Sequence, residues 1–160
     1  MARCTDHLAV LYVTVGTHQQ PFQRLLDALA DLPAEELVVQ FGHGSAPPGV
    51  ARATAFTSFS ETLHYISEAD AVVTHAGVGS ILSARRYGHV PVVVPRLRRY
   101  GEHVDDHQAE LTRALAVEGL VVPVWETDHL AKALDSVPPR SARLPVPSAG
   151  LQRAVRGALL

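Results

Sequence analysis

Short apolar runs alternate with longer segments of mixed polarity along most of the chain. The strongest apolar run is Leu8–Val15, and others follow at residues 37–41, 51–56, 71–74, 90–94 and 121–124. A nearly continuous apolar run is typical of a strand that is buried on both faces of a parallel sheet. The pattern therefore predicts about six short strands.

Segments with helical periodicity lie between the predicted strands. Helices are expected at residues 21–32, 58–68, 80–87, 105–118 and 127–134. In the first of them Phe22, Leu25 and Leu29 fall on one face. Ser58 and Glu61 have the spacing of a capping box at the start of the second. Such alternation predicts an α/β fold, a Rossmann-like parallel sheet of about six strands flanked by helices.

The chain is predicted to have three parts. Residues 1–135 carry all the predicted strands and form the Rossmann-like domain. Residues 136–148 contain four prolines and few apolar residues, so they are interpreted as a linker. Residues 149–160 fit a short helix, which is marginal alone and needs a surface to pack on. That surface is either the helix's own domain or another chain.

Composition restricts the class of protein. The chain has 160 residues, of which 47% are hydrophobic and 19% charged, as in a globular domain. The net charge of -2 gives no reason to expect a nucleic-acid partner. The single cysteine, Cys4, excludes an intramolecular disulfide. Because no run resembles a membrane span or a signal peptide, we expect a cytoplasmic protein.

The most informative stretch is residues 72–80, where an apolar strand runs into a glycine-rich turn that opens a helix. Gly77 and Gly79 let the backbone approach a ligand closely, and Ser80 can cap the helix and donate to a phosphate. The unpaired N–H groups and the dipole of a helix start favour an anion. The simpler interpretation is that these residues only turn the chain. Their position at the carboxyl end of the sheet favours a phosphorylated ligand, with a nucleotide as the first hypothesis.

Several other loops share that end of the predicted sheet. They lie at Gly16, at Gly42 and at residues 56–60 and 95–108. Because ligands of parallel α/β sheets bind beyond the carboxyl ends of the strands, these loops and the glycine-rich turn are expected to form one site.

The sequence resembles the C-terminal, nucleotide-sugar-binding half of GT-B glycosyltransferases of family 28. The likeness extends over residues 8–134, and its pieces in order are VTVGT at 13–17, FTSF at 56–59, AD at 69–70, HAGVGS at 75–80, GHVPVVVP at 88–95 and DHQ at 106–108. The small stand-alone subunits of two-part UDP-sugar transferases are the most similar group. They include the catalytic subunit of the dolichol-linked UDP-GlcNAc transferase and bacterial exopolysaccharide counterparts. The resemblance implies one half of a GT-B fold.

The resemblance also implies a UDP-sugar site with no further cofactor. No metal is expected, since no third ligand is evident beside His103 and His107. The Gly16 loop and the turn from His75 would hold the diphosphate, the backbone near Phe59 would meet the uracil, and Gln108 would reach the sugar hydroxyls. The residues assigned to this site are Gly16, Thr17, Phe59, His75, Gly77, Gly79, Ser80, Ser83, His107 and Gln108.

Two departures from the family pattern matter. Many relatives carry a glutamate near position 83 for the ribose hydroxyls, and here that residue is Ser83. A complete GT-B enzyme also has an acceptor-binding half, for which this chain has no room. The resemblance therefore implies a membrane-anchored partner subunit, which would bring the chain to the inner face of the membrane.

The implied function is the donor-binding subunit of a two-component hexosyltransferase. It would transfer a hexose or N-acetylhexosamine to a lipid-linked or polysaccharide acceptor. The alternative is a non-catalytic nucleotide-binding or regulatory module, which Ser83 favours.

Some polar residues near the predicted site allow two interpretations. His18 is a candidate general base or a plain loop residue. His103 and His107 have helical spacing for a metal, but no third ligand is evident. Arg96 belongs to a basic loop with residues 98–100, which either neutralises diphosphate, faces a membrane or partner, or is merely solvated.

Overall fold

The computed structural model describes residues 8–32, 34–50, 52–141, 152–153 and 155–157. One sheet of six parallel strands runs through this part of the chain. The strands are β1 (Leu8–Thr14), β2 (Ala34–Gln40), β3 (Arg52–Thr54), β4 (Ala71–Thr74), β5 (Val92–Val93) and β6 (Val122–Pro123). Their order, β3-β2-β1-β4-β5-β6, is the Rossmann order. The predicted parallel sheet is confirmed.

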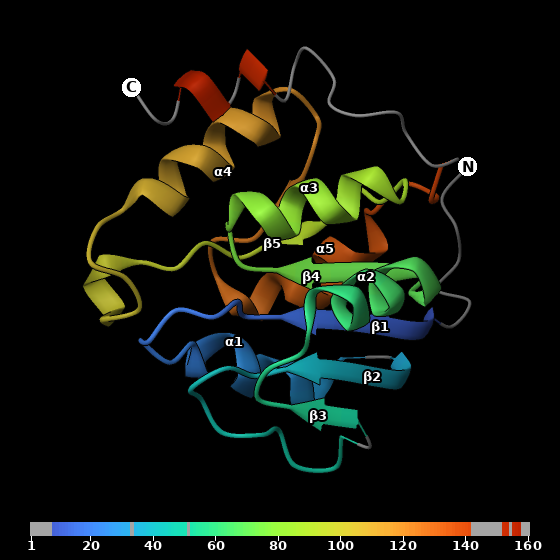
Figure 1. The fold of residues 1–160 in the computed structure, drawn as a ribbon. Helices are drawn as coiled ribbons and strands as arrows, with labels where there is room; N and C mark the ends of the chain where they lie inside the picture. Colours follow the sequence, from blue (N-terminus) through green and yellow to red (C-terminus); the bar gives the residue numbers. More distant parts are fainter. Residues whose placement is uncertain (1–7, 33, 51, 142–151, 154, 158–160) are drawn as a thin grey trace.

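Helices cover both faces of the sheet (Figure 1). They are α1 (Gln23–Ala28), η1 (Leu29–Asp31), α2 (Phe59–Glu68), α3 (Val78–Arg86), η2 (Arg98–Tyr100), α4 (His107–Val117), η3 (Thr127–His129) and α5 (Leu130–Asp135). One apolar cluster joins the sheet to α1 and α5, whereas two others join the opposite face to α2, α3 and α4.

Strand β1 explains why the apolar runs are continuous rather than alternating. Leu11 and Val13 face the cluster of α1 and α5, whereas Tyr12 between them faces α2. All three are at most 1% exposed. A strand covered on both sides needs apolar residues at every position, which is the pattern of the sequence.

Some predicted boundaries hold and others were wrong. The capping box of α2 is present, since the Ser58 side chain accepts from the backbone N–H of Glu61 and the Glu61 carboxylate accepts from that of Ser58. Helix α3 begins at Val78, two residues earlier than predicted, and Gly77 occupies its N-cap position. Ser80 therefore lies inside the first turn and does not cap the helix.

The described C-terminal residues lie on the domain itself. Residues 152–153 and 155–157 are helical, and Val155 packs against the cluster of α3 and α4. Arg153 pairs with Glu118 just after α4, at 3.7 Å. The predicted linker lies outside the described residues from 142 to 148, so the division into three parts stays a prediction. No helix in the ranges given above is long and apolar enough to cross a membrane.

Candidate functional site

The loops that follow β1, β4 and β5 meet at the carboxyl edge of the sheet, where the arrowheads point in Figure 1. His75 stands at their centre, directly after β4. A Cβ atom on Gly16 would lie 2.4 Å from its Nε2 atom, and one on Gly77 would lie 2.2 Å from its Cε1 atom. The imidazole ring therefore occupies space that only glycine at both positions leaves free, and Gly16 also has a positive φ of 77°.

Gln108, on the first turn of α4, contacts His75 and the loops that follow β4 and β5. Its Oε1 atom accepts from the backbone N–H groups of Ala76, at 3.2 Å, and of Arg96, at 3.0 Å. Its Nε2 atom lies 3.2 Å from Nδ1 of His75. The side chain is 9% exposed and binds two loops together. Its predicted contact with sugar hydroxyls stays a prediction.

Gln40 is a site residue that the sequence reasoning missed. It is the last residue of β2, and its amide nitrogen donates to the carbonyl groups of Gly16, at 3.0 Å, and of Ala55, at 2.6 Å. Its amide oxygen accepts from the Gly16 N–H and the Thr14 hydroxyl. The available signal was a glutamine that directly follows the apolar residues 37–39 at the end of the strand, because a buried amide needs hydrogen-bond partners.

Arg96 is buried, so the alternative of a solvated loop is wrong for this residue. Its side chain is 1% exposed and lies over the ring of Phe22, 4.9 Å from the ring centroid. One terminal nitrogen donates to the carbonyls of Gln20 and Glu102, and the other donates to the carbonyl of Val15, at 2.7 Å. The planar guanidinium has enough donors to satisfy several loop carbonyls at once.

The charge of Arg96 is partly offset by Glu102. That carboxylate is itself buried, pairs with Arg24 at 3.0 Å and accepts from the N–H of Leu97. Burial lowers the pKa of Arg96 to about 10, and the Glu102 charge opposes that shift. Arg96 therefore remains a cation at neutral pH. The exposed residues of the predicted basic loop are Arg98, Arg99 and Tyr100, of which Arg99 lies 3.6 Å from Glu126.

The first turn of α3 borders His75. Gly77 supplies the N-cap without a side-chain hydrogen bond, while Gly79 is exposed and Ser80 partly exposed. The first N–H groups of this helix are therefore available to an anion. The Ser83 hydroxyl donates to the Gly79 carbonyl at 2.8 Å. Ser83 thus uses its one donor within the helix.

The remaining predicted residues lie at the periphery of this edge. Thr17 is exposed in the loop after β1, and Phe59, the first residue of α2, is 71% exposed. His107 is exposed at the start of α4 and lies near the carboxylates of Asp105 and Glu110, at 3.7 and 3.4 Å. Of the predicted residues that the structure describes, Gly16, His75 and Gln108 lie in the cluster of polar contacts, together with Gln40 and Arg96.

His18 and His103 form a pair beside the cluster, with ring centroids 4.6 Å apart. The Nδ1 atom of His103 lies 2.9 Å from Asp105, whereas Nδ1 of His18 is buried without a partner. Burial and the neighbouring His103 and Arg96 lower the pKa of His18. Within the residues that the structure describes, no three His, Cys, Asp or Glu side chains are grouped as a metal site would require. The role of His18 as a base stays a prediction.

His75 is neutral at physiological pH. Burial, reinforced by the positive charge of Arg96, lowers its pKa from 6.5 to about 3. A neutral imidazole carries one N–H donor and one acceptor nitrogen, so His75 can still donate one hydrogen bond to a ligand.

We expect the free energy of unfolding to fall as the pH drops below 6.5. The unfolded chain binds protons at His75 near pH 6.5, whereas the folded protein does so only near pH 3. The contribution of the neutral His75 to the free energy of unfolding is therefore fully present above pH 6.5. It is lost as the pH falls from 6.5 to about 3, by up to about 1.4 kcal/mol per pH unit for each such histidine. His89, which is 3% exposed and whose pKa burial also lowers, adds to the effect.

Urea unfolding at pH 7.5, 6.0 and 5.0 measures this slope. His75→Asn should reduce it, while His64→Asn, at an exposed position on α2, should leave it unchanged. A slope that is the same in His75→Asn as in the wild type would contradict the assignment.

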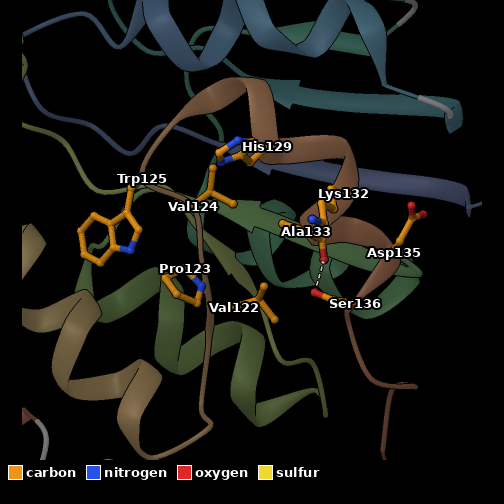
Figure 2. A pocket seen from close by; sticks show the side chains of 9 residues that line it. All are labelled: Val122, Pro123, Val124, Trp125, His129, Lys132, Ala133, Asp135 and Ser136. Carbon is orange, nitrogen blue, oxygen red and sulfur yellow. Dashed lines mark hydrogen bonds between the residues drawn. The ribbon is translucent and has the colours of Figure 1, made fainter. Parts of the chain in front are cut away.

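A second feature lies away from this cluster, along the edge strand β6 and helix α5 (Figure 2). It is an open cavity of about 530 Å³ whose lining includes Val122, Trp125 and Lys132. None of the predicted site residues lines it.

Comparison with known proteins assigns the chain to a family. Residues 10–154 match the model of the glycosyltransferase family 28 C-terminal domain. The chain belongs to this family. The resemblance seen in the sequence is thereby confirmed, and with it the class of glycosyltransferase.

The curated relatives carry one common description. The UDP-N-acetylglucosamine transferase subunit ALG13 of Yarrowia lipolytica is 32% identical over 139 residues, which are 77% of this chain and 68% of that protein. The protein of the same name from Cryptococcus neoformans is 35% identical over 98 residues, or 59% of this chain and 46% of the relative. The mouse protein is 32% identical over 122 residues, which make up 68% of this chain and only 10% of the mouse protein.

Two solved glycosyltransferases share the fold of this chain. The kitacinnamycin glycosyltransferase matches with a TM-score of 0.55 and 22% identity, over 98% of this chain and 39% of its own. CalG4, the calicheamicin glycosyltransferase, matches with a TM-score of 0.54 and 21% identity, over 99% of this chain and 40% of its own. At this identity the likeness shows the fold alone.

Proposed function

We propose that this chain is the donor-binding subunit of a two-component glycosyltransferase, and that its donor is UDP-N-acetylglucosamine. The ALG13 relatives, which are named as subunits of a UDP-N-acetylglucosamine transferase, support the donor and the subunit role. The observation that carries the proposal is the position of His75 between Gly16 and Gly77, beside the start of α3. There a neutral imidazole lies beside the start of α3, whose first N–H groups have no partner within the helix.

This arrangement suits the leaving group of an inverting transfer. An acceptor hydroxyl attacks the anomeric carbon, the bond from that carbon to the phosphate oxygen breaks, and UDP departs with the electron pair. Negative charge grows on the diphosphate as the bond breaks. Fixed N–H donors aimed at the diphosphate stabilise this transition state more than the ground state. The base that takes the acceptor proton is proposed to come from the partner subunit, with His18 as the candidate on this chain.

The second subunit is proposed to be membrane-anchored and to bind a lipid-linked acceptor. The ALG13 relatives are named as transferase subunits, which supports the existence of a partner subunit. The chain would then work at the cytoplasmic face of the membrane through its partner. A polysaccharide acceptor, as in exopolysaccharide synthesis, is the other acceptor class within this proposal.

Titration calorimetry with UDP and UDP-N-acetylglucosamine tests the proposal. The isolated chain is expected to bind both but to transfer little or no sugar, and transfer should appear once the membrane-anchored partner subunit is added. Arg86 is exposed at the far end of α3, away from the proposed site. The variant Arg86→Ala should therefore bind UDP as the wild type does. The absence of any nucleotide binding would refute the proposal.

One observation favours a second candidate, a non-catalytic nucleotide-binding module. Ser83 replaces the family glutamate, and its hydroxyl is already bonded within α3. This candidate predicts UDP binding without transfer even when the partner is present, so the reconstituted pair separates the two.

A further inference from the structure

We propose that Gln108 is a positioning residue that fixes His75 as the tautomer protonated on Nε2. In this role Gln108 would keep one N–H of the imidazole permanently aimed at the phosphate groups of the ligand. The identity of the ligand rests on the function proposed above, but the tautomer can be tested without any ligand.

The orientation of the Gln108 amide follows from its partners. Two backbone N–H groups, those of Ala76 and Arg96, point at the same terminal atom of the side chain, at 3.2 and 3.0 Å. Both are donors, so that atom must be the amide oxygen, since an NH₂ group there would place donors against donors. The NH₂ group must therefore be the end that faces His75.

This orientation determines where the His75 proton resides. The NH₂ group of Gln108 lies 3.2 Å from Nδ1 of His75 and can only donate. Nδ1 must accept, which means that it carries no proton. Burial and the cationic Arg96 disfavour the doubly protonated ring, so the single proton of the neutral ring is on Nε2.

The protonated nitrogen is the one that faces the site. Nε2 is close to the backbone of both Gly16 and Gly77, where Cβ atoms would lie 2.4 and 2.6 Å from it. Among the residues that the structure describes, it has no hydrogen-bond partner. A donor at this position, next to the first turn of α3, adds to the helix N–H groups that attract an anion.

The alternative role for Gln108 is a purely structural one, in which it joins the loops after β4 and β5. Gln108→Glu separates the two roles. The carboxylate can still accept from both backbone N–H groups, so the loops keep their connection. It then presents an acceptor instead of a donor to Nδ1, which favours a proton on that nitrogen.

Long-range nitrogen–proton NMR of ¹⁵N-labelled, ligand-free protein at pH 7.5 reads the tautomer directly. We expect the wild type to show His75 protonated on Nε2 and Gln108→Glu to show a proton on Nδ1. UDP affinity, measured by calorimetry, should fall about tenfold or more in the variant, because one donor to a charged group is lost or misdirected. Gln152→Glu makes the same charge change at an exposed position and should alter neither result.

The outcomes separate the inference from the proposed function. A wild-type ring protonated on Nδ1, or an unchanged tautomer in Gln108→Glu, overturns the positioning role. Protonation on Nε2 without any UDP binding supports the tautomer assignment and overturns the proposed function. Should Gln108→Glu fail to fold, Gln108→Met removes the donor without adding charge, and a mixture of both tautomers is then the expected result.

Discussion

Replacing Arg96 with methionine is expected to lower the free energy of unfolding by about 4 kcal/mol. The guanidinium donates to the carbonyls of Val15, Gln20 and Glu102, and each would lose its donor, those of Val15 and Glu102 in buried positions. An unsatisfied buried polar group costs roughly 1–3 kcal/mol. Methionine retains much of the apolar contact with Phe22, so the loss reports mainly on the hydrogen bonds.

Urea unfolding at pH 7.5 measures this effect. Arg98→Met is the matched control, because Arg98 is exposed two residues away, and it should change stability by less than about 0.5 kcal/mol. If Arg96→Met costs less than about 1 kcal/mol, Arg96 does not join the loops in the way described.

The second large effect is expected from Gly77→Ala. The backbone at Gly77, with φ -79° and ψ 128°, suits alanine, so no backbone strain is added; the effect is mainly steric, with a smaller loss because alanine is a poorer N-cap than glycine. The new Cβ atom would lie 2.2 Å from Cε1 of His75, whose ring is confined on its other side by Gly16. The ring must move and give up its hydrogen bond to Gln108. We expect a stability loss of roughly 1–3 kcal/mol and a fall in UDP affinity of about 100-fold.

NMR of the His75 ring, urea unfolding and UDP calorimetry report the three consequences separately. Gly79→Ala adds the same methyl group two residues further along the chain, where no atom lies within 4 Å of the new Cβ atom. This control should leave the His75 resonances in place and keep or raise stability, since alanine favours a helix over glycine. Unshifted His75 resonances in Gly77→Ala would contradict the proposed fit of the ring between the two glycines.

The architecture could be predicted from hydrophobic pattern because that pattern is local. Leu8–Thr14 shows its burial on both faces in its own composition, and the capping box of α2 requires only Ser58 and Glu61. The parallel sheet then places the loops after β1 and β4 at one edge without further information. The family motifs point to the same edge, so His75 and Gly77 could be selected from sequence.

The interior of the site could not be predicted in this way, because its hydrogen bonds join residues far apart in the chain. Arg96 donates to the carbonyl of Val15, 81 positions away, and no local sequence pattern near either residue predicts this contact. An arginine beside other arginines suggests an exposed loop, and only the packed structure reveals that this one is enclosed. Gln108 shows the same limit, since its amide could face a ligand or the protein until its partners are known.

The connections made by Gln40, Arg96 and Gln108 also bear on the entropy of ligand binding. Each of these side chains bonds to at least two segments at the carboxyl edge, so the segments form one mechanical unit. A loop that is already immobilised loses little conformational freedom when a ligand arrives. Ligand binding at this edge is therefore expected to have a small entropic penalty from the protein backbone, because these loops already lose their conformational freedom when the chain folds.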